Sequence, residues 1–180
     1  SDLADKTRPE RAARAALSAA RAFVEAGAAD KARPLFAQAA AQGGAIGADA
    51  AHGLAAVELD ARQPAKALEV ATQALAALSA AKDRDPARLA TLELDKADAL
   101  WELPGRRDEA AAAYAEIAKK QPAETPVGRA ARAMTALALL EKGRHAEAVA
   151  AADSFLAAKG AADGGTRLLD VQAIRAEALL

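Results

Sequence analysis

The chain of 180 residues contains no cysteine, and aromatic residues make up only 3% of it. Without cysteine there is no disulfide, no thiolate nucleophile and no cysteine-ligated zinc. The scarcity of aromatic residues, together with few Val, Ile and Thr, argues against a β-sandwich or barrel. No apolar run approaches the length of about eighteen residues that marks a membrane-spanning helix. These absences leave the helix as the expected structural element.

An excess of charge of either sign is also missing. The chain has 24 basic and 25 acidic residues, which gives a formal net charge of −1. A balanced chain has no general attraction to nucleic acid or to an anionic membrane. We therefore expect no nucleic-acid binding and, with no apolar run long enough to span a membrane, no direct membrane insertion.

Alanine is the most abundant residue of the chain. Hydrophobic residues account for 53% of the chain, and most of them are alanine or leucine. Alanine is the strongest helix former, and its small side chain lets two helices approach closely. The composition therefore predicts an all-α protein.

A pattern of alanine, apolar and glycine positions recurs along the chain. It reads Ala-x-x-apolar-apolar-x-x-Gly-x-x-x-x-Ala, and its clearest copies start at Ala20 and Ala136. Glycine ends a helix in the left-handed conformation, so each copy predicts two helices joined by a short turn. The break positions are Gly27, Arg62, Gly105 and Gly143, and the alanines five positions later are Ala32, Ala67, Ala110 and Ala148.

The repeats predict a single domain over residues 1–180. Four helical hairpins should occupy approximately residues 9–43, 47–84, 86–122 and 127–160, followed by a terminal helix at 166–180. Each hairpin buries only one face by itself, so neighbouring hairpins must stack. We expect small residues such as Ala20 and Ala32 where paired helices cross, and Phe23, Tyr114 and Phe155 buried between hairpins.

Three segments carry a resemblance to a known family. The best match is Gly105-Arg106-Arg107-Asp108-Glu109-Ala110 with Tyr114 and Pro122, followed by Gly143 to Ala148 and Gly27 to Phe36. The chain resembles tetratricopeptide (TPR) repeat proteins over nearly its whole length, and Arg62 at one break marks the array as divergent. The resemblance implies a right-handed α-solenoid of four helical hairpins plus a C-terminal helix. It also implies a concave groove that binds a protein or peptide.

A second resemblance bears on the compartment. The segment from Tyr114 through Pro122, and on from Ala130 to Leu156, is similar to repeats of bacterial envelope proteins. Those are the outer-membrane assembly lipoproteins and the periplasmic coordinators of the Tol system. This resemblance implies a bacterial protein of the cell envelope, in the periplasm, with the cytoplasm as the alternative.

The TPR resemblance also implies which residues line the groove, namely those on the first helix of each hairpin, one position away from the packing face. The first of these helices has a basic face. That face is either a solvated end of the protein or an anchor for acidic peptide groups or a carboxy terminus. Its basic residues are Arg8, Arg11, Arg14 and Arg21, and the expected groove residues are Arg14, Leu17, Arg21, His52, Ala56, Thr91, Leu94, Asp98, Ala133 and Leu137.

Few side chains point to catalysis or metal binding. His52 lies one turn after Asp49, a pair that could share a metal, but no second His or Cys supports a site. Asp95, Asp98 and Glu102 fall on one face of a helix. Paired carboxylates can perform acid–base chemistry, but on an alanine-rich amphipathic helix a solvated face is the expected role.

The remaining candidates have plain explanations. His145 lies in a turn and is expected to have a structural or solvent-facing role. The pairs Gly43-Gly44 and Gly164-Gly165 lack the lysine and the preceding strand of a phosphate-binding loop. We predict no catalytic residue, no metal and no cofactor.

Two classes of function follow from the repeats. The first is a protein-interaction scaffold or adaptor, and the alternative is a regulatory or sensory TPR module of a larger signalling or enzyme chain. Because the break of a fifth copy would fall beyond Leu180, that alternative stays open. The terminal helix carries an apolar stripe that we expect to support self-association. The stripe consists of Leu168, Val171, Ile174 and Leu179.

Overall fold

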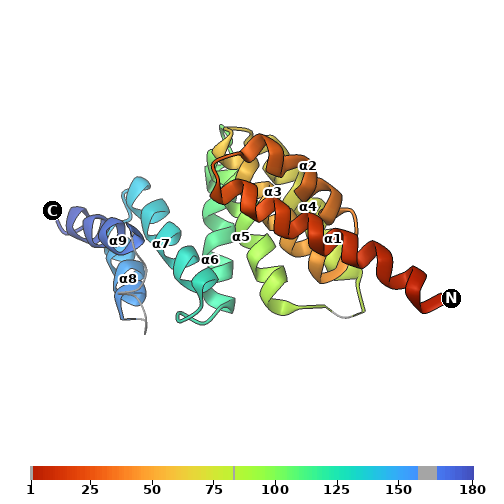
Figure 1. Cartoon of the computed structure of the whole chain (residues 1–180). Helices are drawn as coiled ribbons and strands as arrows, with labels where there is room; N and C mark the ends of the chain where they lie inside the picture. Colours follow the sequence, from red (N-terminus) through yellow and green to blue (C-terminus); the bar gives the residue numbers. More distant parts are fainter. Residues whose placement is uncertain (1, 83, 158–165) are drawn as a thin grey trace. The chain divides into compact units, whose positions relative to one another are not determined.

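The computed structural model of the chain describes residues 2–82, 84–157 and 166–180. These residues form nine helices and no strand, which confirms the all-α prediction (Figure 1). The helices are α1 (Asp2–Glu25), α2 (Ala29–Ala40), α3 (Gly44–Asp60), α4 (Pro64–Ala80), α5 (Pro86–Glu102), α6 (Arg107–Lys120), α7 (Pro126–Glu141), α8 (His145–Leu156) and α9 (Thr166–Glu177).

The helix ends differ from the predicted ones at a few places. The first helix begins at Asp2 and runs through Pro9, which we had placed at its start. A proline inside a helix removes one backbone hydrogen bond, and here the helix continues past it. The second helix ends at Ala40, shortly before the predicted end of the first hairpin at residue 43. The predicted end of the fourth hairpin, at Lys159-Gly160, lies outside the described residues.

All four predicted helix breaks have a left-handed backbone. The φ angles are 70° at Gly27, 57° at Arg62, 75° at Gly105 and 68° at Gly143. After three of these breaks, the next amide donates to the carbonyl five residues earlier, as from Ala28 to Phe23 at 2.8 Å. This is the Schellman arrangement that closes a helix. Arg62 adopts it although a side chain makes the left-handed region less favourable by about 1–2 kcal/mol.

Packing divides the described residues into two compact units, one up to Ala99 and one from Leu100 onward. Helices of a repeat array contact mainly their neighbours in sequence, so compact groups of helices arise within the array. We refer to these groups as unit 1 and unit 2. The boundary falls inside α5.

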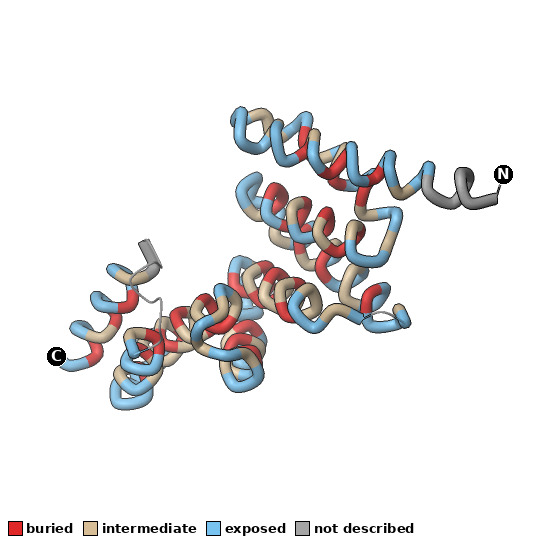
Figure 2. Tube along the Cα trace, turned by 60° about the horizontal axis from the view of Figure 1, so that its bottom comes forward, coloured by how far each residue is buried: buried red, intermediate tan, exposed pale blue. Residues whose placement is uncertain are grey.

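Alanine forms much of the core in both units. In unit 1, Ala20, Ala32, Ala55 and Ala67 have no solvent-exposed surface, as their predicted place at helix crossings requires. Figure 2 shows buried positions recurring along the helices rather than gathered in one segment. Gly53 extends this close packing, because a Cβ atom there would lie 2.4 Å from Cε1 of Phe36. The ring of Phe36 on α2 therefore packs directly against the backbone of α3 at that point.

The large side chains behave as predicted except for one. Tyr114 and Phe155 are fully buried in unit 2, and Tyr114 packs edge-on against Trp101 with ring centroids 6.1 Å apart. Phe23, which we expected to be largely buried, is only partly buried. Its ring lies at the edge of the unit 1 core, where the Lys31 ammonium covers it at 5.7 Å.

The last helix is held in unit 2 by part of its apolar stripe. Val171 and Ile174 are buried against residues of α7 and α8, and Leu168 packs beside them. Leu179 does not belong to this buried part, because it follows the end of α9 and is 61% exposed. Leu169 and Leu180 are also exposed. The stripe therefore serves mainly to attach α9 to its own unit.

Candidate functional site

The first helices of the hairpins in unit 1 share an exposed face. We define the first-helix face by Arg14 and Arg21 on α1, His52 and Ala56 on α3, and Thr91 on α5. The helices α1 and α3 contact each other, and a hydrogen bond between side chains connects α3 to α5. This face therefore contains the unit 1 residues that sequence reasoning placed in a binding groove, with the exceptions described below.

The centre of the first-helix face is a hydrogen-bonded histidine and aspartate. Nδ1 of His52 lies 2.9 Å from both carboxylate oxygens of Asp95, which is 43 positions away in the sequence. Asp95 is 6% exposed, so our expectation that it belongs to a solvated face was wrong. It is buried because α3 packs over this part of α5. His52 pairs with Asp95 and not with Asp49, the partner that the sequence suggested.

The surroundings of this pair shift the pKa of both side chains. The hydrogen bond to Asp95 raises the pKa of His52; burial opposes the rise, the charges of Asp95 and Asp49 support it, and Arg21 opposes it. Burial raises the pKa of Asp95, and the histidine partly offsets that rise. Because Nδ1 is occupied, His52 presents Nε2 as its remaining hydrogen-bonding atom. That side chain is half exposed.

A second bridge between α3 and α5 lies at Asp49. Its carboxylate accepts from Nε of Arg88 at 2.7 Å and from Nη2 at 3.1 Å, a two-point contact. Arg88 also pairs with Asp85, which caps α5 by accepting from the amide of Ala87 at 2.9 Å. Two-point arginine–carboxylate contacts fix geometry better than a single ion pair does. Two polar bridges thus join α3 to α5 beside their apolar contacts.

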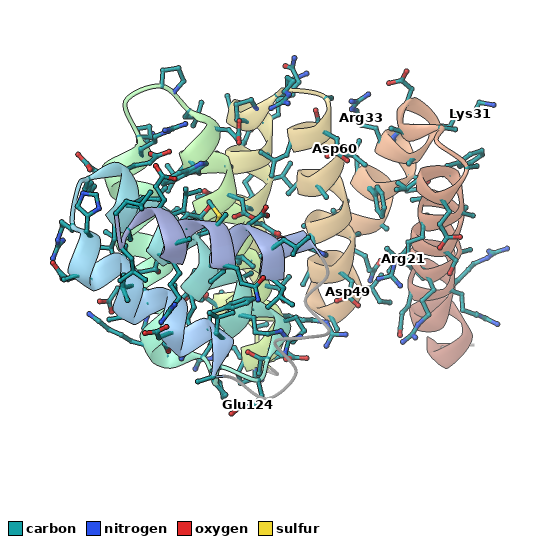
Figure 3. The ribbon with its side chains drawn as sticks, turned by 90° about the vertical axis from the view of Figure 1, so that its left-hand side faces the viewer. Arg21, Lys31, Arg33, Asp49, Asp60 and Glu124 are labelled. Atoms are coloured by element: carbon teal, nitrogen blue, oxygen red, sulfur yellow. The ribbon has the colours of Figure 1, made fainter. Side chains whose placement is uncertain are left out.

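The basic residues of α1 differ in their surroundings. Arg14 donates to Glu10 at 2.7 Å, an exposed pair one helical turn apart. Arg21 forms no ion pair with any described residue, and its charge is close enough to affect His52. Figure 3 shows Arg21 and Asp49 projecting from neighbouring helices. Of the two groove arginines that the sequence suggested, Arg21 is the one available to a ligand.

The other predicted groove residues differ in their exposure, and two of them lie in unit 2. Leu17 is 7% exposed and belongs to the core of the first hairpin, so its side chain does not face a ligand. Leu94 and Asp98 are partly buried on α5. Ala56 is exposed, and Thr91 donates its hydroxyl to the Ala87 carbonyl at 3.1 Å. Ala133 and Leu137 lie on α7, in unit 2.

Ala133 and Leu137 line an open groove. Together with Met134 they form its α7 side, and residues of α9 form the other side. The groove has a volume of about 580 Å³. We call it the α7–α9 groove, and it lies entirely within unit 2. The sequence suggested the two α7 residues, but not that α9 would complete the site.

A buried ion pair was missed by sequence reasoning. Glu58 is 4% exposed, and its Oε1 accepts from Nε of Arg33 at 2.7 Å. Its Oε2 is buried without a hydrogen-bond partner among the described residues. Figure 3 shows Arg33 on α2 beside the end of α3, where Asp60 lies. The pair joins the second helix of one hairpin to the first helix of the next.

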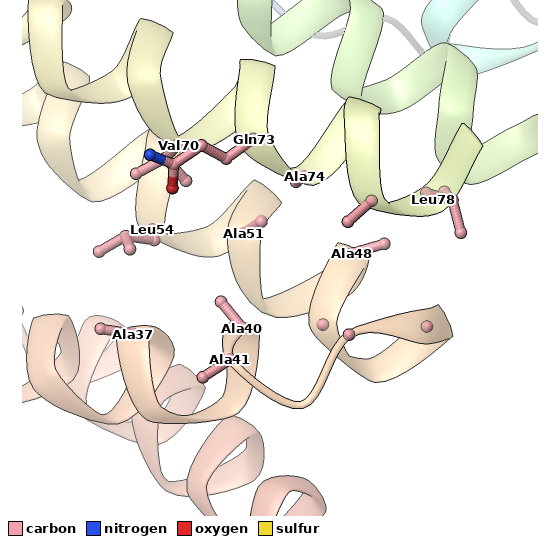
Figure 4. A pocket seen from close by; sticks show the side chains of 14 residues that line it. Ala37, Ala40, Ala41, Ala48, Ala51, Leu54, Val70, Gln73, Ala74 and Leu78 are labelled. Carbon is pink, nitrogen blue, oxygen red and sulfur yellow. The ribbon is translucent and has the colours of Figure 1, made fainter. Parts of the chain in front are cut away.

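A cleft of about 340 Å³ lies between α2, α3 and α4 (Figure 4). Its lining is almost entirely small and apolar, as at Ala37, Ala48 and Ala74. The polar exception is Gln73, whose amide donates to Glu69 at 3.0 Å. This lining offers shape but no charge to a ligand.

The described residues hold no group of three or more His, Cys, Asp or Glu side chains arranged to bind a metal ion. Among the same residues, none of the helices combines the length and the apolarity that crossing a membrane requires. His145 lies on the surface at the start of α8, in line with the solvent-facing role expected for it.

Comparison with known proteins identifies the fold. The chain is similar to two crystal structures of a putative kinesin light chain from Podosopora anserina, described as having nearly identical TPR-like repeats. One, of a variant form, aligns with a TM-score of 0.69 and 24% identity over 94% of this chain and 85% of that chain. The other gives 0.68 and 24% over 95% and 86%.

These alignments show that the chain has a TPR-like helical-repeat fold, as the repeat pattern predicted. No family model matches the sequence, and no curated protein matches it.

Proposed function

We propose that this protein is an interaction scaffold that binds a segment of a partner protein on the first-helix face. TPR-like repeats generally mediate contacts between proteins and are typically not enzymes, which supports this choice. The single observation that carries the proposal is the contrast between exposed and buried positions on the first helices of the hairpins. Arg21, His52 and Ala56 are exposed on a face whose neighbouring positions, such as Ala20 and Ala55, are completely buried.

The polar bridges of α3 and α5 suit this role. The pairs His52–Asp95 and Arg88–Asp49 connect the two helices while leaving His52, Arg88 and Asp49 partly exposed. A rigid face loses little conformational entropy when a partner binds. Arg21 then supplies a charge that is not already paired within the described chain.

Site-specific photo-crosslinking tests the proposal. A photoreactive phenylalanine analogue at Ala56 samples the first-helix face, and the same group at Gln38, exposed on α2, samples a second helix. In cells of the source organism we expect a discrete adduct from position 56 and not from position 38. Adding Arg21→Glu should weaken the adduct without changing the helical circular dichroism signal. Equal adducts from both positions, or an adduct insensitive to Arg21→Glu, would count against this binding face.

A further inference from the structure

The α7–α9 groove has an apolar floor made of short or buried side chains. Val171 and Ile174 form its base and are almost completely buried. Ala133 and Ala173 contribute little more than a methyl group each, which leaves room above the base for a side chain from outside. Met134 adjoins them, and methionine adapts its shape to different apolar partners. The floor therefore suits aliphatic side chains.

The rim of the groove is acidic. Asp170 on α9 lies in the lining, and no cation belongs to it. Glu177 follows Asp170 by two helical turns, so it projects from the same side of α9. Arg175 lies on this helix too, but it is engaged with Asp153 of α8 at 2.5 Å. An apolar floor beside an acidic rim is complementary to a segment that is both aliphatic and basic.

We propose that the α7–α9 groove binds a segment of a partner protein in which leucine or isoleucine side chains lie beside lysine or arginine. The aliphatic side chains would lie against Leu137, Ala133 and Ile174, and the cation would pair with Asp170. This inference rests on the proposed scaffold function but names the chemistry of a second contact, in unit 2. It also gives the predicted groove residues Ala133 and Leu137 a role.

Two synthetic peptides test the chemistry. Both have 14 residues and carry a fluorescent label; one is an amphipathic sequence of leucine and lysine, the other of leucine and glutamate. Each is titrated into the full chain, and binding is followed by fluorescence anisotropy. We expect the lysine peptide to bind at least tenfold more tightly than the glutamate peptide. Equal affinities, or preference for the glutamate peptide, would overturn the proposal.

A charge-matched pair of variants locates the binding. Asp170→Lys places a cation in the groove, whereas Asp60→Lys makes the same change at an exposed position in unit 1. We expect Asp170→Lys to weaken the lysine peptide about tenfold and Asp60→Lys to leave it nearly unchanged. Equal weakening by both would show a general charge effect and overturn the groove assignment. Met134→Glu, with helical content checked by circular dichroism, should weaken both peptides, since it disrupts the apolar floor.

A second copy of the chain is the competing occupant, because Leu169, Leu179 and Leu180 are exposed on and after α9. Light scattering of the peptide-free chain separates the two cases. A monomer with an open groove agrees with the proposal, and a dimer that Met134→Glu dissociates overturns it. The crosslink at Ala56 reports on unit 1 alone. An adduct there with no peptide binding would reject this inference and leave the proposed function standing.

Discussion

Glu58 occupies a position that the other three hairpins give to a large apolar residue. The equivalent residues, four positions before each break, are Phe23, Trp101 and Leu139. A buried carboxylate is costly unless it is paired, and here Arg33 supplies one hydrogen bond while Oε2 has none among the described residues. The arginine is less dependent on the pair, because it also contacts Asp30 at 2.9 Å and keeps a third of its surface exposed.

This asymmetry predicts opposite results for the two single substitutions. Arg33→Leu leaves the Glu58 carboxylate buried without a partner, and stranding a buried charge typically costs about 3–5 kcal/mol. Glu58→Leu restores the apolar residue type of the other hairpins and leaves Arg33 with Asp30, so it should be neutral or stabilising. Urea unfolding of both variants checks this. Equal destabilisation by the two would contradict the view that the carboxylate is the costly partner.

At the scale of elements, α3 and α5 are joined by the His52–Asp95 bond, and this contact should depend on pH. The pKa of His52 is raised in the folded protein, mainly by its hydrogen bond to Asp95. Its contribution to stability is therefore fully present below the unfolded pKa of histidine, about 6.5. It is lost as the pH rises through the higher folded value. Asp49 and Arg21 also act on His52, with opposite signs.

We expect the free energy of unfolding to fall between about pH 6 and pH 8.5 in the wild type and to change less in His52→Gln. The difference should stay below about 1 kcal/mol, because His52 is half exposed and solvent screens its charge. The raised pKa of Asp95 acts in the same direction, but in the acid range. Urea unfolding across this pH range is the measurement. Parallel curves for the two proteins would show that the bond does not favour the charged histidine.

The elements also show what the sequence can and cannot predict. Helix breaks at Gly27, Gly105 and Gly143 were predictable because a left-handed backbone is a local requirement of one residue. The burial of Asp95 was not predictable, because it depends on packing against α3. The contacting residue of that helix, His52, lies 43 positions away in the sequence. The buried ion pair of Glu58 could have been predicted from the sequence. A glutamate at a repeat position that is otherwise apolar indicates a buried carboxylate, which needs a basic partner.

Grooves are harder to predict than helices. The apolar stripe on α9 was visible in the sequence, but it was not evident that Val171 and Ile174 would both pack against α7 and α8 and form the base of an open groove. The groove depends on how α7 and α9 cross, which repeat spacing does not specify. Sequence reasoning therefore found Ala133 and Leu137 but missed Asp170, the charge beside them.

At the scale of the whole molecule, the two compact units should respond separately to local damage. In repeat proteins stability is approximately a sum of local terms and contacts between neighbours, so a defect spreads only as far as those contacts carry it. Each unit has its own large buried side chain. Phe36 is 3% exposed in unit 1, and Phe155 is fully buried in unit 2.

Two reciprocal substitutions test this independence, each serving as the control for the other. Truncating a buried phenylalanine to alanine typically costs about 3–5 kcal/mol. Phe36→Ala should therefore lower the hydrogen-exchange protection of amides in α1–α4 and leave those in α7–α9 nearly unchanged, because exchange reports local opening. Phe155→Ala should do the reverse. Loss of protection throughout the chain in both variants would mean that the array unfolds as one cooperative block, in which damage to either proposed binding surface would disable the other.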